Sequence, residues 1–286
     1  MLKLKIFRLQ DPESEKNLLS LQTNSNANLK YDQSINKKTY GESRILLKHP
    51  CSRYRLWSAF RCYRGVLFFD KMTLRELQKN SPYTAGMTGC GFMVDEMTKA
   101  LPLFLSEDSD ALLKQEIQNN EILLMPTLVT RQKAVREFTR RFKAVPLSFW
   151  ETYLTLSPKM QILAMFFVLL KAYRLYFDFQ VEVVRNKWNS FNQTVSKNDF
   201  LAAISDIACN DEFVDSWSDN TRDRVAAAFL SVLRKVGFIS DKDGDLRQLE
   251  YSDEDLSFFV RIGEPWFLDA ILIPPYRIET IKSIAL

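Results

Sequence analysis

SPKMQILAMFFVLLKAY, residues 157–173, is the stretch that decides the fold. Its uncharged apolar run, Met160 to Leu170, has 11 residues, whereas a helix that crosses a bilayer needs about 20. Ser157 followed by Pro158 is a typical N-cap and first-turn pair, because the serine oxygen can accept from an unpaired amide and proline lacks one. The stretch therefore predicts a central helix buried inside a globular protein, with no membrane partner.

The sequence around this run predicts more helices. The chain has 286 residues, 46% of them hydrophobic, which is enough for a core in one domain or two. Its 8 glycines and 10 prolines are few, which disfavours sandwiches and barrels. Helical patterns cover Phe92–Leu105, where Pro102 should end or kink the helix, Glu107–Gln118, Pro146–Leu156, Arg174–Trp188, Lys197–Ala208 and Arg222–Val236. We expect an all-α, globular multi-helix domain.

The most informative stretch for function is TLVTRQKAVREFTRRFKAV, residues 127–145. Leu128, Val135, Phe138, Phe142 and Val145 recur at helical spacing and predict the docked face. Lys133, Arg136, Arg140 and Lys143 recur at the same spacing on nearly the opposite face. Thr127 and Thr130 are both candidate N-caps. The pattern predicts an amphipathic helix that offers cations, either as a solvated face or to a partner.

The distribution of charge favours a partner. The formal net charge is +4, but residues 1–80 hold 16 Lys and Arg against 7 Asp and Glu, a net charge of +9. Residues 81–286 hold 23 against 28, a net charge of −5. The body is thus mildly acidic, and the run from Arg131 to Lys143, with six cations and one anion, is a local exception.

Two groups of helices suggest DNA-binding motifs. The helix predicted at 107–118, a connection over Asn119–Pro126 and the basic helix match a helix-turn-helix arrangement, although the connection is long. Farther on, FISDKDGDLRQLEY, residues 238–251, has the Asp-Gly signal of a small β-hairpin, which after three helices indicates a winged helix. A second DNA-binding element would use Arg222, Arg224, Arg234 and Lys235. Acidic residues argue against a DNA-binding wing and leave protein binding open: Asp241, Asp243, Asp245, Glu250, Asp253, Glu254 and Asp255.

The N-terminal part differs from the rest. Gln22–Tyr40 has the composition of a disordered segment, and Cys51–Asp70 alternates arginines with aromatic residues. That second run could suit an anionic surface; the alternatives are a short mixed helix or no fixed structure. Met72 precedes the first clear pattern and is a candidate native start. We predict an extension over 1–71, a helical domain with the buried helix over 72–190, and a winged-helix-like subdomain over 191–286.

Several classes of site are disfavoured. The four cysteines and the single histidine, His49, lack metal-ligand spacing. The glycine cluster Gly86–Gly91 lacks the lysine of a phosphate-binding loop. Carboxylate pairs such as Asp95 and Glu96 are adjacent in sequence, which does not divide acid from base. We expect no enzyme activity, no metal and no cofactor, and, because no signal peptide is evident, a cytoplasmic protein with reduced thiols.

Several short motifs follow one another in a recognisable order: Tyr83–Phe92 (YTAGMTGCGF), Asp95-Glu96, Asn119-Asn120, Ile122–Leu124, Thr130, Arg140–Phe142, Tyr173–Leu175, Phe177–Phe179, Glu182-Val183 and Gly263–Trp266. Over roughly residues 81–280, this order resembles the BrxA family of BREX bacteriophage-exclusion systems. The motifs are core and turn residues, so it is their order that makes the resemblance specific. Residues 1–71 and the acidic hairpin have no counterpart in it.

The resemblance implies a non-enzymatic, all-helical protein that binds double-stranded DNA and works beside a methyltransferase, an ATPase and other defence components. It also implies that cations of the basic helix contact phosphate, namely Arg131, Lys133, Arg136, Arg140 and Arg141. Lys143 is added to these contacts because of its helical spacing. No base readout is predicted. The alternatives are a protein-interaction scaffold whose basic helix docks on an acidic subunit, and a helical RNA-binding protein.

Overall fold

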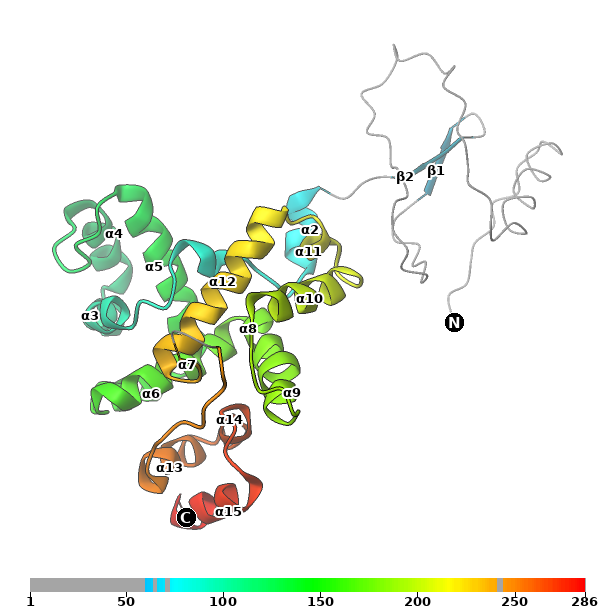
Figure 1. Ribbon diagram of the computed structural model, residues 1–286. Helices are drawn as coiled ribbons and strands as arrows, with labels where there is room; N and C mark the ends of the chain where they lie inside the picture. Colours follow the sequence, from blue (N-terminus) through cyan, green and yellow to red (C-terminus); the bar gives the residue numbers. More distant parts are fainter. Residues whose placement is uncertain (1–59, 64–65, 70–72, 241–243, 286) are drawn as a thin grey trace. The chain divides into compact units, whose positions relative to one another are not determined.

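The computed structural model describes residues 60–63, 66–69, 73–240 and 244–285. The chain divides into two compact units, Met1–Met72 and Thr73–Leu286. In the first unit, β1 (Phe60–Tyr63) pairs antiparallel with β2 (Val66–Phe69), with Phe60 opposite Phe69 (Figure 1). Neither a helix nor an unstructured segment forms over these residues, because they are rich in strand-forming aromatic and branched side chains. The rest of the basic and aromatic run lies outside the described residues.

The second unit is built of helices, which confirms the all-α prediction for this unit. Its elements are α2 (Leu74–Asn80), η1 (Gly86–Gly89), α3 (Val94–Leu105), α4 (Ser109–Asn119), α5 (Leu128–Phe142), α6 (Leu147–Tyr153), α7 (Pro158–Ala172), α8 (Arg174–Asp178), η2 (Phe179–Val184), α9 (Arg185–Trp188), α10 (Lys197–Ala208), α11 (Glu212–Asp215), α12 (Asp219–Val236), α13 (Asp253–Arg261), α14 (Trp266–Ala270) and α15 (Pro275–Ala285). Within the described part of the chain, no helix combines the length and apolar character needed to span a membrane.

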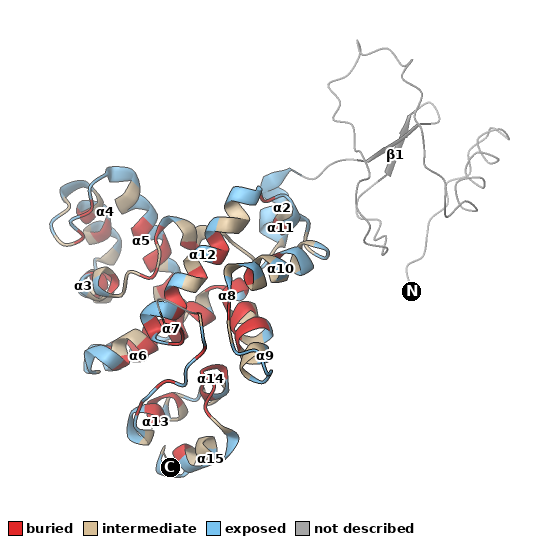
Figure 2. Ribbon diagram, viewed as in Figure 1, coloured by how far each residue is buried: buried red, intermediate tan, exposed pale blue. Residues whose placement is uncertain are grey.

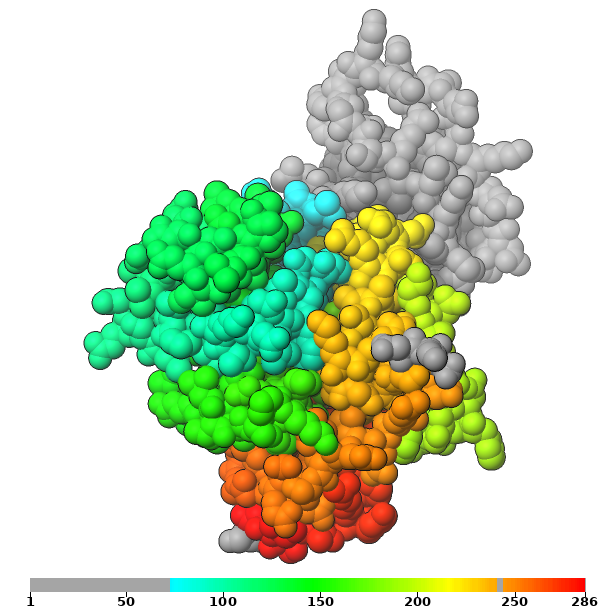
Figure 3. All heavy atoms as spheres, turned by 60° about the vertical axis from the view of Figure 1, so that its left-hand side comes forward, coloured from blue at the N-terminus to red at the C-terminus, as the bar shows by residue number. Residues whose placement is uncertain are grey.

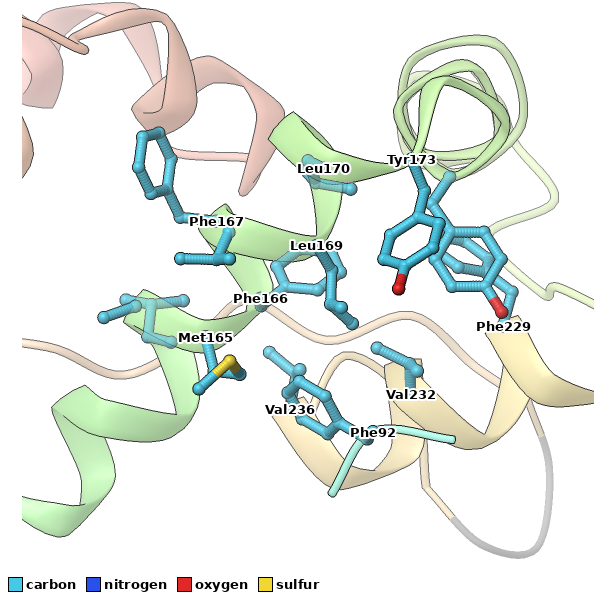
Figure 4. Packing of buried hydrophobic residues seen from close by; sticks show 14 of the residues in the cluster. Phe92, Met165, Phe166, Phe167, Leu169, Leu170, Tyr173, Phe229, Val232 and Val236 are labelled. Carbon is cyan, nitrogen blue, oxygen red and sulfur yellow. The ribbon is translucent and has the colours of Figure 1, made fainter. Parts of the chain in front are cut away.

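The buried central helix is α7, as predicted. The Ser157 hydroxyl accepts from the Met160 amide at 3.3 Å, and Pro158 takes the first position. Every residue from Leu163 to Leu170 is buried, in contact with α3, α5, α8 and α12 (Figure 2). In Figure 4, Phe92 lies beside Val232 and Val236 of α12, and these three side chains face those of α7. This helix therefore supplies the surface on which the others dock.

The structure fixes two helix boundaries. Pro102 does not end α3, which continues to Leu105. Proline costs an interior helix one hydrogen bond, but Leu101 and Phe104 on either side of it are buried and anchor the last turn. The segment from Arg174 follows α7 closely without continuing it, because the backbone of Tyr173 is extended. Its middle is a π-helix, η2.

Of the predicted C-terminal hairpin, the described residues show only part. Ile239 and Leu246 form one isolated antiparallel bridge, and the Arg247 amide donates to the carbonyl of Phe238 at 2.7 Å. The second arm also bridges to Thr194 through Asp245. No two-stranded ladder forms in the described residues here, because the second arm divides its backbone bonds between two partners. Asp241 and Asp243, at the predicted turn, lie outside the described residues.

The acidic residues after this segment belong to a helix. Asp253, Glu254 and Asp255 form the first turn of α13, where the helix dipole favours negative charge. Ser252 caps this helix by accepting from the Asp255 amide at 3.1 Å, and Asp253 pairs with Arg277 at 2.7 Å. These acids therefore stabilise a helix start and do not form a wing.

One continuous hydrophobic core runs through the second unit. It includes side chains of α3, α5 and α7 before residue 190 and of α10, α12 and α13 after it. The domain boundary expected near residue 190 stays a prediction.

Candidate nucleic-acid interface

The basic helix α5 begins at a defined cap. Thr127 is the N-cap, and its hydroxyl accepts from the Thr130 amide at 3.1 Å. The two hydroxyls lie 2.8 Å apart. Of the two predicted caps, Thr127 is therefore the one that the helix uses, and Thr130 supports it.

The connection between α4 and α5 is held by two side chains. The buried carboxylate of Glu116 accepts from the amides of Glu121, Ile122 and Leu123 at 3.2, 2.9 and 2.8 Å. The Asn120 side chain donates to the carbonyl of Met125 at 3.0 Å and accepts from its amide at 2.8 Å. Although long for a helix-turn-helix, this connection thus has a defined conformation that fixes α5 against α4.

Arg131 contributes to the same connection. Its Nε donates to the carbonyl of Ile117 at 2.6 Å and its Nη1 to the carbonyl of Met125 at 3.1 Å. The side chain is half-buried between α4 and α5. The sequence places Arg131 among the phosphate contacts, but in the structure one of its donors joins α5 to α4 and another holds the connection between them.

Arg141 lies in the core. Its side chain is fully buried, with Nη1 2.7 Å from the carbonyl oxygen of Phe92 and Nη2 2.5 Å from that of Gly91. Nη2 also lies 3.1 Å from the sulfur of Met87. Burial raises the pKa of the neighbouring Cys90 thiol, an effect that the Arg141 guanidinium opposes. The expectation that Arg141 contacts phosphate is thus corrected: it stabilises the segment before α3, out of reach of solvent.

The other cations of α5 remain at the surface. Lys133, Arg136, Arg140 and Lys143 are all exposed, on the face opposite the buried Val135 and Phe138. At the start of the helix, Leu128 and Val129 are 40% and 56% exposed, and Leu124 before them is 72% exposed with a positive φ of 49°. The prediction that Leu128 lies on the docked face is therefore wrong, whereas Val135, Phe138 and Val145 are buried as predicted. The outer face of α5 is apolar at its N-terminal end and basic over the rest of its length.

A buried acid lies beneath the basic part of this face. Glu137 is only 1% exposed and accepts a hydrogen bond from the Tyr173 hydroxyl at 2.9 Å. Its carboxylate also lies 3.3 Å from Nε of Arg136 and 3.4 Å from Nε of Arg140. Glu137 is not among the residues that the sequence predicts for a site. Its signal is an acid at the spacing of the buried side chains, three residues after Ala134 and one before Phe138.

Tyr173 completes this arrangement. Burial raises the pKa of its hydroxyl, and the nearby Glu137 acts in the same direction, so the group stays protonated and can donate. The Arg140 guanidinium lies over the Tyr173 ring, 5.7 Å from its centroid. The residue that ends α7 thereby connects the central helix to the cations of α5.

Gly86 leaves the space that Glu137 occupies. A Cβ added to Gly86 would lie 2.7–2.9 Å from the Glu137 carboxyl group. We expect Gly86→Ala to lower the free energy of unfolding by about 1–3 kcal/mol through overpacking. Gly89, in the same short helix, is the matched control, because its added Cβ would meet only Cδ of Lys133, at 3.7 Å. Urea titrations should show Gly89→Ala within about 0.5 kcal/mol of the parent chain; equal losses for both variants would contradict the packing of Glu137 against Gly86.

The predicted second element lies on α12. Arg222 donates to the carbonyls of Asp215 at 2.9 Å and Trp217 at 3.3 Å, so its guanidinium is used to hold the end of α11. Arg224, Arg234 and Lys235 are exposed. The short helix η1 contacts both α5 and α12, and in Figure 3 the cyan chain around it lies between the green helices and the yellow α12.

Comparison with known proteins identifies the family and the fold. The BrxA family model matches residues 81–254. A crystal structure of an uncharacterized protein from Magnetospirillum magneticum is similar to 68% of this chain and to 100% of its own, with a TM-score of 0.59 at 20% sequence identity. At that identity the likeness shows the fold alone. A search of curated proteins finds no match. The family match covers more than half of the sequence and contains α5 with its surroundings: the chain belongs to the BrxA family.

Proposed function

We propose that the protein, as a member of the BrxA family, acts in BREX phage defence as a non-enzymatic, cytoplasmic subunit that binds the backbone of double-stranded DNA through the exposed face of α5. The observation that carries the proposal is the row of four exposed cations, Lys133, Arg136, Arg140 and Lys143, on one helix of an otherwise acidic body. Phosphate contacts supply most of the sequence-independent affinity of proteins for DNA.

The surroundings of α5 support this use. The helix is docked on α7 by its apolar side, capped at Thr127 and fixed to α4 by Glu116, so its cations are offered from a rigid element. In this proposal, α4 and α5 act as a helix-turn-helix with a lengthened connection, and α5 lies along a groove. Arg224, Arg234 and Lys235 of α12 would extend the contact; the winged-helix form of this second element remains part of the proposal.

A second candidate is a protein scaffold within the defence complex, for which the methyltransferase and the ATPase are the proposed partners. The observation that favours it is the exposed apolar group of Leu124, Leu128 and Val129 beside the cations. Leucine at a positive φ is strained, and strain of this kind is often kept at sites of interaction. DNA binding explains the greater part of the exposed face, whereas this group covers only its N-terminal end.

Charge reversal of two lysines tests DNA binding. The double variant Lys133→Glu/Lys143→Glu should weaken binding to a 20-base-pair duplex at least about tenfold and make log Kd about two units less steep in log salt. The two lysines are chosen because neither contacts Glu137 in the described structure, so the buried acid is not disturbed. Binding is measured by fluorescence anisotropy between 50 and 300 mM KCl.

The matched control is Lys79→Glu/Lys282→Glu, which makes the same change of net charge on α2 and α15, away from α5 (Figure 1). Its affinity should stay within about threefold of the parent chain, as expected for a long-range effect screened by salt. Equal weakening by both double variants would mean that net charge alone, and no face of α5, attracts the DNA. Tight binding of a partner subunit in high salt with no binding of duplex would favour the scaffold, and preference for structured RNA would favour the third alternative.

A further inference from the structure

Two exposed arginines of α5 share one buried carboxylate. Nε of Arg136 donates to Oε1 of Glu137 at 3.3 Å, and Nε of Arg140 lies 3.4 Å from Oε2. The arginine side chains are 66% and 41% exposed, whereas that of Glu137 is 2% exposed. Each carboxylate oxygen therefore lies close to one guanidinium, and both arginine side chains also reach solvent.

The carboxylate itself has little freedom to move. The Tyr173 hydroxyl donates to Oε2 at 2.9 Å, and Gly86 leaves room for the carboxyl group only because it lacks a Cβ. The Tyr173 hydroxyl is itself fixed in the core, since Tyr173 ends the central helix α7 and is 1% exposed. This sets the cluster apart from an ordinary surface ion pair, in which both partners are mobile and contribute little.

Because Arg136 and Arg140 approach Glu137 through Nε, their Nη donors are the ones left for a ligand. A guanidinium has five N–H donors in a planar fork, and only one of them is on Nε. With Nε directed at Glu137, the Nη groups of both arginines stay available on the outer side. Residues four apart on a helix are neighbours, with about 5–6 Å between their Cβ atoms, so the two sets of donors can converge on one small anion.

The charge of the cluster fits the same ligand. Arg136 and Arg140 with Glu137 carry a net charge of +1, which one phosphodiester neutralises. Arginine pairs favour planar or tetrahedral oxyanions because several N–H groups can bind two oxygens at once. Two lysines at these positions would provide the same charge without the fork.

We propose that Glu137 is a positioning residue that holds Arg136 and Arg140 as one paired site for a single phosphate of the DNA backbone, with Tyr173 and Gly86 fixing the carboxylate. The inference rests on the proposed function. Held side chains lose less freedom on binding than free ones, so the buried acid strengthens the binding of an anion even though it carries the same sign of charge.

Glu137 carries the same sign of charge as the phosphate, so a charge effect and a positioning effect predict opposite changes in DNA affinity. If Glu137 acted only through its charge, Glu137→Gln would remove a repulsion and tighten DNA binding. As a positioning residue, the same variant should weaken binding about tenfold, because two rotamer-rich side chains must then be ordered by the ligand. In the background Arg136→Lys/Arg140→Lys, where no guanidinium is held, Glu137→Gln should leave the affinity unchanged or tighten it.

The experiment uses the full chain and four proteins: the parent, Glu137→Gln, Arg136→Lys/Arg140→Lys, and their combination. Anisotropy with the same duplex gives each Kd at two salt concentrations, and thermal unfolding reports whether each variant is folded. The lysine pair alone should bind about tenfold more weakly than the parent, with the salt dependence unchanged because the charge is unchanged. This arm does not depend on how well Glu137→Gln folds.

The outcomes separate the inference from the proposed function. Equal affinity of the parent and the lysine pair, or tighter binding by a folded Glu137→Gln protein, overturns the paired site while DNA binding stands. A parent chain that does not bind duplex overturns the proposed function and the inference with it. The paired site is supported if Glu137→Gln and Arg136→Lys/Arg140→Lys each bind DNA more weakly than the parent and their combination shows no further loss of affinity.

Discussion

Arg141→Ala is expected to lower the free energy of unfolding by about 3–5 kcal/mol. The guanidinium donates to the carbonyls of Gly91 and Phe92 from a fully buried position. Alanine would leave both oxygens without these donors and open a cavity beside Phe138, whose ring lies 5.5 Å from the Arg141 guanidinium carbon. Because these contacts hold the segment between η1 and α3 against α5, the loss should reach the global stability of the second unit.

Its neighbour provides the control. Arg140→Ala removes an exposed side chain whose ion pair with Glu137 is shared with Arg136, so it should cost under about 1 kcal/mol. Urea titrations at 25 °C give the two stabilities, and the DNA assay should rank the variants in the opposite way: Arg140→Ala weakens binding at full stability. Similar losses of stability for both would contradict the burial of Arg141 and would place it with the surface cations.

The sequence does distinguish the buried Arg141 from the exposed Arg140, but through helical spacing and not through charge. Spacing alone puts Arg141 three residues after Phe138 and seven after Ala134, on the apolar side, and puts Arg140 with Lys133 and Arg136 on the other. All six cations of residues 131–143 were predicted to lie at the surface, because a fully buried arginine is rare. Helical phase was therefore the better guide, and it also locates Glu137 on the inner side.

Other features could not be predicted from local sequence. The Asp-Gly signal at 243–244 and the pairing of Leu246 with Ile239 are local, whereas the pairing of Asp245 with Thr194 depends on a segment about 50 residues earlier. The hydrogen bond from Tyr173 to Glu137 could not be predicted either, because it depends on the packing of α7 against α5. By contrast, the start and stop of α7 were predictable because Ser157, Pro158 and the apolar run are contiguous.

The connection between α4 and α5 carries the second large expected effect. Glu116→Ala should lower the free energy of unfolding by about 2–4 kcal/mol, because hydrogen bonds to a charged group are strong and buried amides without an acceptor are costly. The carboxylate accepts from three consecutive amides, those of Glu121, Ile122 and Leu123, and is itself 4% exposed. Glu116→Gln retains one carbonyl oxygen and should recover about half of the loss.

The exposed Glu121 is the matched control, since among the described residues its carboxylate accepts only from the Asn119 side chain, at 3.2 Å. Glu121→Ala should change stability by less than about 0.5 kcal/mol. Amide hydrogen exchange locates the effect: in Glu116→Ala the amides of 121–123 should lose protection before those of α7. Unchanged protection there would show that the backbone of the connection holds itself. If protection is lost as expected, the orientation of α5, and with it that of the cations proposed to contact DNA, depends on this buried acid of α4.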